Sequence, residues 1–160
     1  MNKSEIKIIL AADHAGFDLK NKIKAWLEEN GYSVLDVGAH TLVPEDDYPV
    51  YMSSASLKVA EDMSGVTKAI IFGGSGQGEA IVANRFPGVR AVVWYGDNES
   101  NTDLDIIKLS REHNDANVLS IGARFVSEEQ TKIAITKWLS TPFSNEEKHE
   151  RRNRLIDSIE

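Results

Sequence analysis

The stretch AIIFGGSGQGE, residues 69–79, decides the fold of this chain of 160 residues. Its first four residues are apolar, which is typical of a short buried strand. Four glycines follow within residues 73–78 and give the backbone the freedom to turn tightly. Residues 79–85 then predict a short helix. A buried strand that turns through glycines directly into a helix is a building unit of parallel α/β sheets.

Strands and helices alternate on both sides of this stretch. Apolar runs predict four further strands, over residues 6–12, 33–37, 90–94 and 118–121. Helical spacing and helix-end signals predict helices over residues 19–29, 48–63, 104–111, 127–139 and 148–159. This alternation predicts an α/β fold, a three-layer Rossmann-like domain with a five-stranded parallel sheet and helices on both faces. Because we see no repeat or second-domain signal, we expect residues 1–160 to form a single domain.

The composition narrows the classes of function. The formal charge is −7, from 18 Lys and Arg against 25 Asp and Glu. Such a surface repels nucleic acids and anionic membranes, so we expect neither as a partner. The sequence has no cysteine, which excludes disulfides and thiolate catalysis. We find neither a signal peptide nor a transmembrane stretch in the sequence, and we expect a cytoplasmic protein.

Three motifs follow predicted strands: Asp13-His14, the glycine loop at 73–78, and Arg124. Ligands of parallel sheets bind at such carboxyl ends. The unpaired N–H groups where the loop enters a helix predict an anion site. Glu79 stands where a Walker loop would need lysine, and the G-x-G-x-G spacing differs from the dinucleotide fingerprint. The alternative is a tight turn in which Glu79 is a favourable first-turn acid.

Glu79 is an unusual neighbour for a phosphate, which its carboxylate would repel. The residue makes sense if the loop stabilises an enediolate while Glu79 moves a proton, and Ser75 could donate a hydrogen bond to the same oxyanion. The helix N-terminus favours the ionised form of Glu79, which we expect near neutral pH. Asp13-His14 has two interpretations: a helix cap beside a surface histidine, or a pair for the ring oxygens of a sugar.

Positive charge is concentrated near the C-terminus. An acidic chain that binds an anion needs a local basic cluster, and one is formed by Lys148, His149, Arg151, Arg152 and Arg154. Arginine forks match phosphate geometry. Glutamates interleave with this cluster, so a solvated terminal helix is the alternative. His113 has two interpretations as well: it could protonate a ring oxygen near neutral pH, or be favoured only as a charge near a helix C-terminus.

Seven motifs follow one another along the chain: ADHAG at 12–16, DYP at 47–49, GGSGQGE at 73–79, ANR at 83–85, REHNDAN at 111–117, GAR at 122–124, and His149 with Arg151-Arg152. In this order they closely resemble the type B ribose-5-phosphate isomerase family, which also contains galactose-6-phosphate isomerase subunits. Each motif alone is weak evidence, but the set is specific and covers nearly the whole chain.

The resemblance implies a role for each matched residue. In one branch of the family the base is a cysteine directly after the third strand, where this chain has Gly73; in the other it is a glutamate, which Glu79 matches. The catalytic residues would be Glu79, Ser75, Asp13 and His113, with Asp13 and His113 opening the furanose ring. The substrate-binding residues would be Gly74, Gly76 and Gly78 for the enediolate, Tyr48 and Asn114 for the sugar, and His14, Arg124, Lys148, His149 and Arg152 for the phosphate.

The resemblance also implies a reaction and an assembly. The reaction would be aldose–ketose isomerisation through a cis-enediolate, most simply between ribose 5-phosphate and ribulose 5-phosphate. Family members are homodimers or dimers of dimers whose sites use residues of two chains, and we expect the C-terminal helix, about 145–159, at the dimer interface. We expect no metal and no other cofactor, and the scattered histidines lack a metal-ligand spacing.

One departure from the family leaves the substrate open. Residues 94–108 form a longer and more acidic connection than we expect for the family, and they lie just before His113. Galactose, allose or tetrose phosphate therefore remain alternative substrates, and a sugar-phosphate-binding module without catalysis remains an alternative function. A nucleotide-binding oxidoreductase is disfavoured by the glycine spacing.

Overall fold

The computed structural model describes residues 5–96 and 105–159. Its centre is a sheet of parallel strands in the order β2-β1-β3-β5-β4. The strands are β1 (Lys7–Ala12), β2 (Ser33–Asp36), β3 (Thr67–Gly73), β4 (Ala91–Trp94) and β5 (Val118–Gly122). The expected five-stranded parallel sheet is confirmed, and the ends of each predicted strand lie within two residues of the observed ends.

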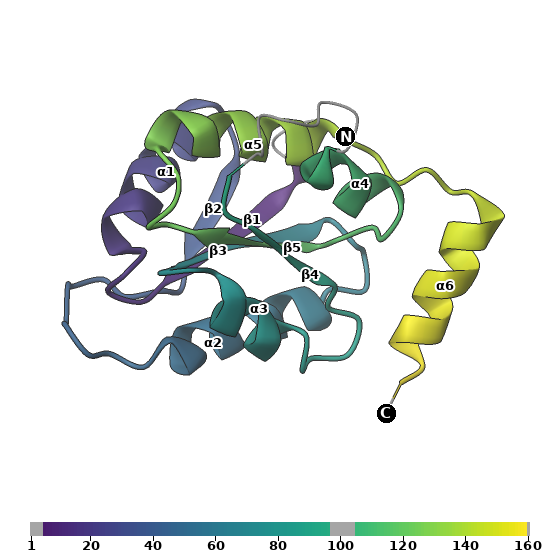
Figure 1. Cartoon of the computed structure of the whole chain (residues 1–160), viewed down its shortest axis with the longest axis horizontal. Helices are drawn as coiled ribbons and strands as arrows, with labels where there is room; N and C mark the ends of the chain where they lie inside the picture. The colour runs from purple at the N-terminus through teal and green to yellow at the C-terminus, as the bar shows by residue number, and fades with distance from the viewer. Residues whose placement is uncertain (1–4, 97–104, 160) are drawn as a thin grey trace.

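Helices cover both faces of this sheet (Figure 1). On one face lie α1 (Phe17–Glu29), α4 (Ile106–Glu112) and α5 (Glu128–Ser140), and on the other lie α2 (Tyr48–Ala60) and α3 (Gln77–Ala83). The last helix, α6 (Glu147–Asp157), stands apart from both layers on the side of α4. The predicted three-layer Rossmann-like architecture is therefore confirmed. No helix within the described ranges is long and apolar enough to cross a membrane.

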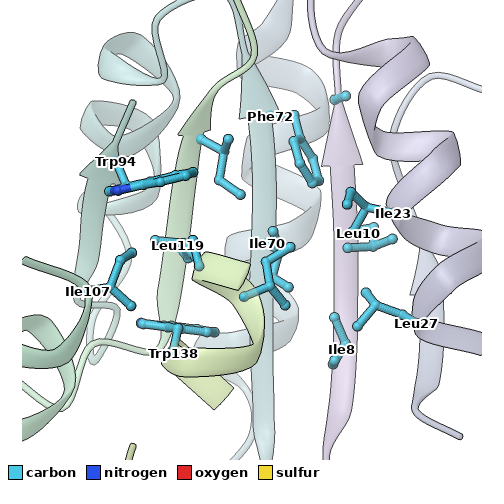
Figure 2. Packing of buried hydrophobic residues seen from close by; sticks show 14 of the residues in the cluster. Ile8, Leu10, Ile23, Leu27, Ile70, Phe72, Trp94, Ile107, Leu119 and Trp138 are labelled. Atoms are coloured by element: carbon cyan, nitrogen blue, oxygen red, sulfur yellow. The ribbon is translucent and has the colours of Figure 1, made fainter. Parts of the chain in front are cut away.

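The position of β3 in the centre of the sheet explains the apolar run at residues 69–72. All residues of β3 are buried, because helices cover the sheet on both sides. Ile70 and Phe72 pack on the face of α1 and α5, where Trp138 closes the core (Figure 2). Ala69 and Ile71 point to the opposite face, against α2 and α3. A strand buried on both faces reads as a continuous apolar run, without the alternation of a half-exposed strand.

Most helix-end signals act as predicted, and two do not. Ser127 forms the expected capping box with Gln130 at the start of α5. The sequence SNEE at residues 144–147 predicts a side-chain cap for the last helix, and this is wrong, since Glu146 is the N-cap and no side chain caps α6. The helix predicted over 48–63 ends already at Ala60. There the carboxylate of Asp62 accepts hydrogen bonds from backbone N–H groups of the turn that leads into β3.

The strand order creates a crevice between the carboxyl ends of β1 and β3. From β1 the chain crosses to β2 on one side and then to β3 on the other side. Ala12 pairs with Phe72, and Gly73 pairs with Gly122 of β5. The residues that follow these three strands therefore leave the sheet side by side, at a position where α/β sheets bind ligands.

Ile70→Ala should destabilise the fold strongly. Ile70 is fully buried on the central strand, so the truncation leaves a cavity that costs about 2–5 kcal/mol. The control is Ile133→Ala on α5, whose side chain is 57% exposed and should change stability by less than about 0.5 kcal/mol. Urea unfolding followed by circular dichroism measures both. Equal losses for the two variants would contradict this description of the core.

Candidate active site

A cleft of about 410 Å³ opens at the carboxyl ends of β1, β3 and β5. Its walls come from four parts of the chain: the turn after β1, the start of α2, the glycine loop after β3, and the turn after β5. The lining residues are Asp13, His14, Ala15, Tyr48, Gly74, Ser75, Gly78, Glu79, Arg124 and Phe125. Most of the site residues predicted from the sequence are thus brought together in one cleft.

The carboxylate of Glu79 is folded back against the end of β3. Glu79 lies in the first turn of α3, and only 4% of it is exposed. A Cβ atom added to Gly73 would overlap this carboxylate. Gly73 is therefore required for space. A side chain at position 73 and the present conformation of Glu79 exclude each other, so the end of β3 has room for only one of these two side chains.

The protein environment raises the pKa of Glu79. Burial is the main cause, and the negative charge of Asp13 adds to it, while a hydrogen bond to the backbone N–H of Glu79 itself opposes it. The effect expected from the helix N-terminus is thus outweighed by desolvation. A carboxylate with a raised pKa is a stronger base whenever it is ionised, so burial here favours proton transfer.

The glycine loop is fixed by the neighbouring strand. The carbonyl oxygens of Gly73 and Gly74 accept hydrogen bonds from Ala123 N (2.8 Å) and Arg124 N (3.2 Å). Gly76 has a left-handed φ of 78°, and its carbonyl accepts a hydrogen bond of 2.7 Å from Ser120 Oγ. With these carbonyl groups turned toward β5, the loop can present its N–H groups to the cleft.

Tyr48 and Arg124 lie against two different glycines of the loop. A Cβ atom on Gly78 would lie 2.7 Å from the Tyr48 hydroxyl, so the phenol ring lies directly against the loop. A Cβ atom on Gly74 would lie 3.2 Å from Cζ of Arg124. Arg124 is exposed, and its side chain has no hydrogen-bond or ion-pair partner in the part of the chain described. Its guanidinium is free to meet an anion.

Asp46, which no sequence pattern predicts as a site residue, lies behind the cleft. Its Oδ1 is 2.7 Å from Nδ1 of His14, and Oδ2 of Asp13 is 3.8 Å from the same nitrogen. Asp13 also accepts hydrogen bonds from the N–H groups of Ala15 and Gly16, which fixes the turn before α1. The three side chains offer ligand atoms within 4.8 Å of one another, close enough for a metal ion. The sequence analysis predicts no metal, and this cluster does not depend on the spacing of the histidines.

Five predicted site residues do not reach this cleft within one chain. His113 and Asn114 follow α4 and precede β5, so they lie at the amino end of that strand, whereas the cleft lies at the carboxyl ends. The five residues of β5 put about 13 Å between its first and last Cα atoms. Lys148, His149 and Arg152 lie on α6, where the ring of His149 stacks on that of His113 at 4.1 Å. The predicted residues thus form two groups: the cleft group at the carboxyl ends of the strands, and the α6 group beside the amino end of β5.

Burial lowers the pKa of His149, and the nearby His113 lowers it further. Only 4% of His149 is exposed, and its Nε2 makes no hydrogen bond within residues 5–96 and 105–159. Lys148 pairs with Glu146 at 2.8 Å. Arg90 fixes the far end of α6 through a two-pronged contact with Asp157, at 3.0 and 3.1 Å. This contact holds α6, and with it Lys148, His149 and Arg152, against the rest of the chain.

Comparison with known proteins identifies the family. Residues 8–156 match the model of the family described as Ribose/Galactose Isomerase. The chain belongs to the ribose/galactose isomerase family. The resemblance found in the sequence is thereby confirmed.

Relatives within the ribose/galactose isomerase family match over almost their full length. Ribose-5-phosphate isomerase B of Escherichia coli is 38% identical, with 96% of both chains covered. The protein of the same name from Mycolicibacterium paratuberculosis is 34% identical over 97% of this chain and 92% of its own. The crystal structure of the Thermotoga maritima enzyme superposes with a TM-score of 0.85 at 34% identity, covering 96% of this chain and 99% of its own.

One further structure contains a ligand. Ribose-5-phosphate isomerase B of Mycoplasma genitalium, solved with bound ribulose-5-phosphate, is 27% identical and has a TM-score of 0.85. The alignment covers 96% of this chain and 98% of that one. This chain and the Mycoplasma genitalium protein therefore share one fold, and neither has a large insertion relative to the other.

Glu79→Gln should raise the melting temperature near neutral pH. Because the pKa of Glu79 is raised in the folded state, the parent loses stability as pH rises above the ordinary value of 4.5. The neutral amide avoids this cost, and each kcal/mol gained corresponds to about 2–4 °C. The gain should vanish as pH falls toward that ordinary value. A Glu79→Gln variant that melts below the parent at pH 8, with exposed Glu28→Gln unchanged, would contradict this.

Proposed function

We propose that this chain is an aldose–ketose isomerase that interconverts ribose 5-phosphate and ribulose 5-phosphate. The observation that carries the proposal is the buried carboxylate of Glu79, which lines the cleft beside a glycine loop suited to an oxyanion. The names of the curated relatives and the ribulose-5-phosphate complex of the Mycoplasma genitalium relative support the choice of substrate. A binding module would not need a carboxylate with a raised pKa at this place.

Glu79 transfers one proton between adjacent carbons. In the open-chain aldose, the carboxylate removes the proton from C2, and the electron pair of the C–H bond forms the C1–C2 double bond. The carbonyl oxygen on C1 becomes the enediolate oxyanion, which the N–H groups of the loop and Ser75 stabilise. The proton of the C2 hydroxyl passes to the oxyanion on C1, and the C2 oxygen then forms the ketose carbonyl as Glu79 returns its proton to C1.

The remaining predicted site residues, from the cleft and from the α6 group, would bind and open the sugar. Asp13 and His113 would transfer the protons that open the furanose ring, and Tyr48 forms a wall of the sugar pocket. Asn114 would bind a hydroxyl group. The phosphate would meet His14 and Arg124 from this cleft, together with Lys148, His149 and Arg152 from the α6 group. These roles follow the matched positions of the family. Four of the residues, Asp13, His14, Tyr48 and Arg124, line the same cleft.

The sugar is best identified by a substrate panel with product identification. Aldose and ketose phosphates of four, five and six carbons, including allose and galactose 6-phosphate, should be compared by kcat/KM. Ribose 5-phosphate should give the largest value, with ribulose 5-phosphate as the product. A preference for a six-carbon phosphate would keep the isomerase but change its substrate. Tight binding without any product would instead favour the binding module.

We infer that the active enzyme is a homodimer that shares its sites. Glu79 lies at the carboxyl ends of the strands and His113 at the amino end of β5, so the two residues of one chain do not contact the same substrate molecule. Two chains related by a twofold axis could bring the α6 group of each to the cleft of the other. Helix α6 stands apart from the body and exposes Leu155 and Ile156, at 61% and 45%, which suits a helix that packs on a partner.

Glu79→Gln should lower kcat by at least about 10²-fold, because the amide keeps the shape of the side chain but does not accept the proton. Affinity for ribose 5-phosphate should stay within a few-fold. Exchange of solvent deuterium into the carbon next to the carbonyl, followed by NMR, should stop as well. Gly73→Ala is a second test, since the new methyl group must displace the carboxylate. Near-parental turnover and exchange in Glu79→Gln would move the base elsewhere, with Asp13 the next candidate.

Mixing two defective variants should restore activity if sites are shared. Glu79→Gln damages the cleft, and Arg152→Ala damages the α6 group. In a hybrid dimer one site carries both changes and the other carries none, so refolding an equal mixture should recover about one quarter of the parental rate. The rate is measured below KM, where it follows kcat/KM. Sedimentation should give twice the chain mass of 17.7 kDa or a multiple of it. A mixture no more active than its separate components would exclude shared sites.

A further inference from the structure

We propose that Asp46 is a positioning residue, which holds His14 in the tautomer that carries its proton on Nδ1 and leaves Nε2 for the ligand. Asp46 lies in the loop before α2 and is not among the residues that line the cleft. The inference rests on the proposed function in one respect, because it takes His14 as a ligand of the substrate phosphate. The tautomer itself can be measured without any substrate.

Two hydrogen bonds join Asp46 to His14. A single oxygen, Oδ1, accepts from the backbone N–H of His14 at 2.9 Å and meets the ring nitrogen Nδ1 at 2.7 Å. The contact spans 32 positions in the sequence, so it fixes the loop as well as the histidine. The two side chains also differ in access to solvent: 7% of the Asp46 side chain is exposed, against 33% for His14. Asp46 therefore holds the ring from behind, while His14 faces the cleft.

The charge of Asp46 decides which nitrogen carries the proton. Burial acts to raise the pKa of Asp46, but the hydrogen bonds from the backbone and the ring of His14 hold it below its ordinary value. An ionised carboxylate only accepts hydrogen bonds, so Nδ1 must be the donor. The remaining nitrogen, Nε2, can accept from a ligand when the ring is neutral and donate to a phosphate oxygen when it is protonated.

The second carboxylate near the ring does not take this part. Oδ2 of Asp13 is 3.8 Å from Nδ1, which is too far for a hydrogen bond, and Oδ1 of Asp13 is engaged by the turn before α1. A metal ion bound to Nδ1 would have to displace the proton that Asp46 accepts. The same measurement therefore distinguishes a hydrogen-bonded histidine from a metal ligand.

The test measures tautomer and affinity in matched variants. Nitrogen-15 NMR of labelled imidazoles reports the protonated nitrogen of each histidine in the free protein, and His14→Asn assigns the His14 signal. Asp46→Ala removes the acceptor. Asp46→Asn retains an oxygen in its place and should rescue. Glu45→Gly is the control, because it removes the neighbouring negative charge at a residue whose φ of 89° suits glycine.

The parent, Asp46→Asn and Glu45→Gly should show the proton on Nδ1, and Asp46→Ala should show it on Nε2. Calorimetry with ribose 5-phosphate and with inorganic phosphate should give an affinity loss of about tenfold for Asp46→Ala and less than about threefold for the others. KM should rise with little change in kcat. A parental His14 with its proton on Nε2, or an unprotonated Nδ1 that shifts when Zn²⁺ is removed, would overturn the proposal. So would Asp46→Ala with the parental tautomer and affinity.

If Glu79→Gln remained active while the tautomer results held, the base assignment would fail and the role of Asp46 would stand. If His14 of the folded parent carried no proton on Nδ1, the role of Asp46 would fail and the assignment of Glu79 as the base would stand. Should Asp46→Ala fail to fold, Asp46→Asn and Asp46→Leu still decide the matter, because only the leucine variant lacks an oxygen to accept from Nδ1.

Discussion

The contact between the Glu79 carboxylate and the bare backbone of Gly73 is the constraint on which the site depends. Only a glycine at the end of β3 leaves room for a buried carboxylate there. That burial raises the pKa of Glu79 and so strengthens the base, at a cost in stability. Asp13, placed by the paired strand β1, increases the effect. The pKa of the proposed base thus depends on the sheet itself, since β1 and β3 fix both carboxylates through their register.

The same register holds the glycine loop, the proposed oxyanion site, in place. Gly73 pairs with Gly122, so the turns after β3 and β5 leave the sheet together, and the carbonyl groups of one are held by the N–H groups of the other. The side chain of Ser120 supplies a further bond to Gly76. A loop of glycines would be disordered if it were on its own. Held in this way, it needs little reorganisation when charge develops on the substrate, which is the condition for effective electrostatic stabilisation.

Much of the fold could be predicted from the sequence, because buried parallel strands leave continuous apolar runs such as 69–72 and glycines mark their ends. The contents of the cleft could also be predicted, since residues that follow parallel strands share one edge. The contact of Asp46 with His14 could not, because a loop has no periodicity and the partners are 32 positions apart. The stacking of His149 on His113 depends on where α6 lies, and no local pattern records that. The steric reason for Gly73 appears only once the Glu79 side chain has been placed.

The proposed reaction has two electrostatic requirements, and the charged side chains that would meet them lie at opposite ends of the strands. Proton abstraction from carbon needs a basic carboxylate, and an arginine beside Glu79 would lower its pKa. Phosphate binding needs cations. In one chain, Arg124 borders the loop at Gly74, whereas Lys148 and Arg152 lie on α6 at the far side. Under the proposed dimer, the partner would supply those cations at the phosphate end of the sugar. The substrate itself would then separate them from Glu79, so the base stays strong while the anion is held.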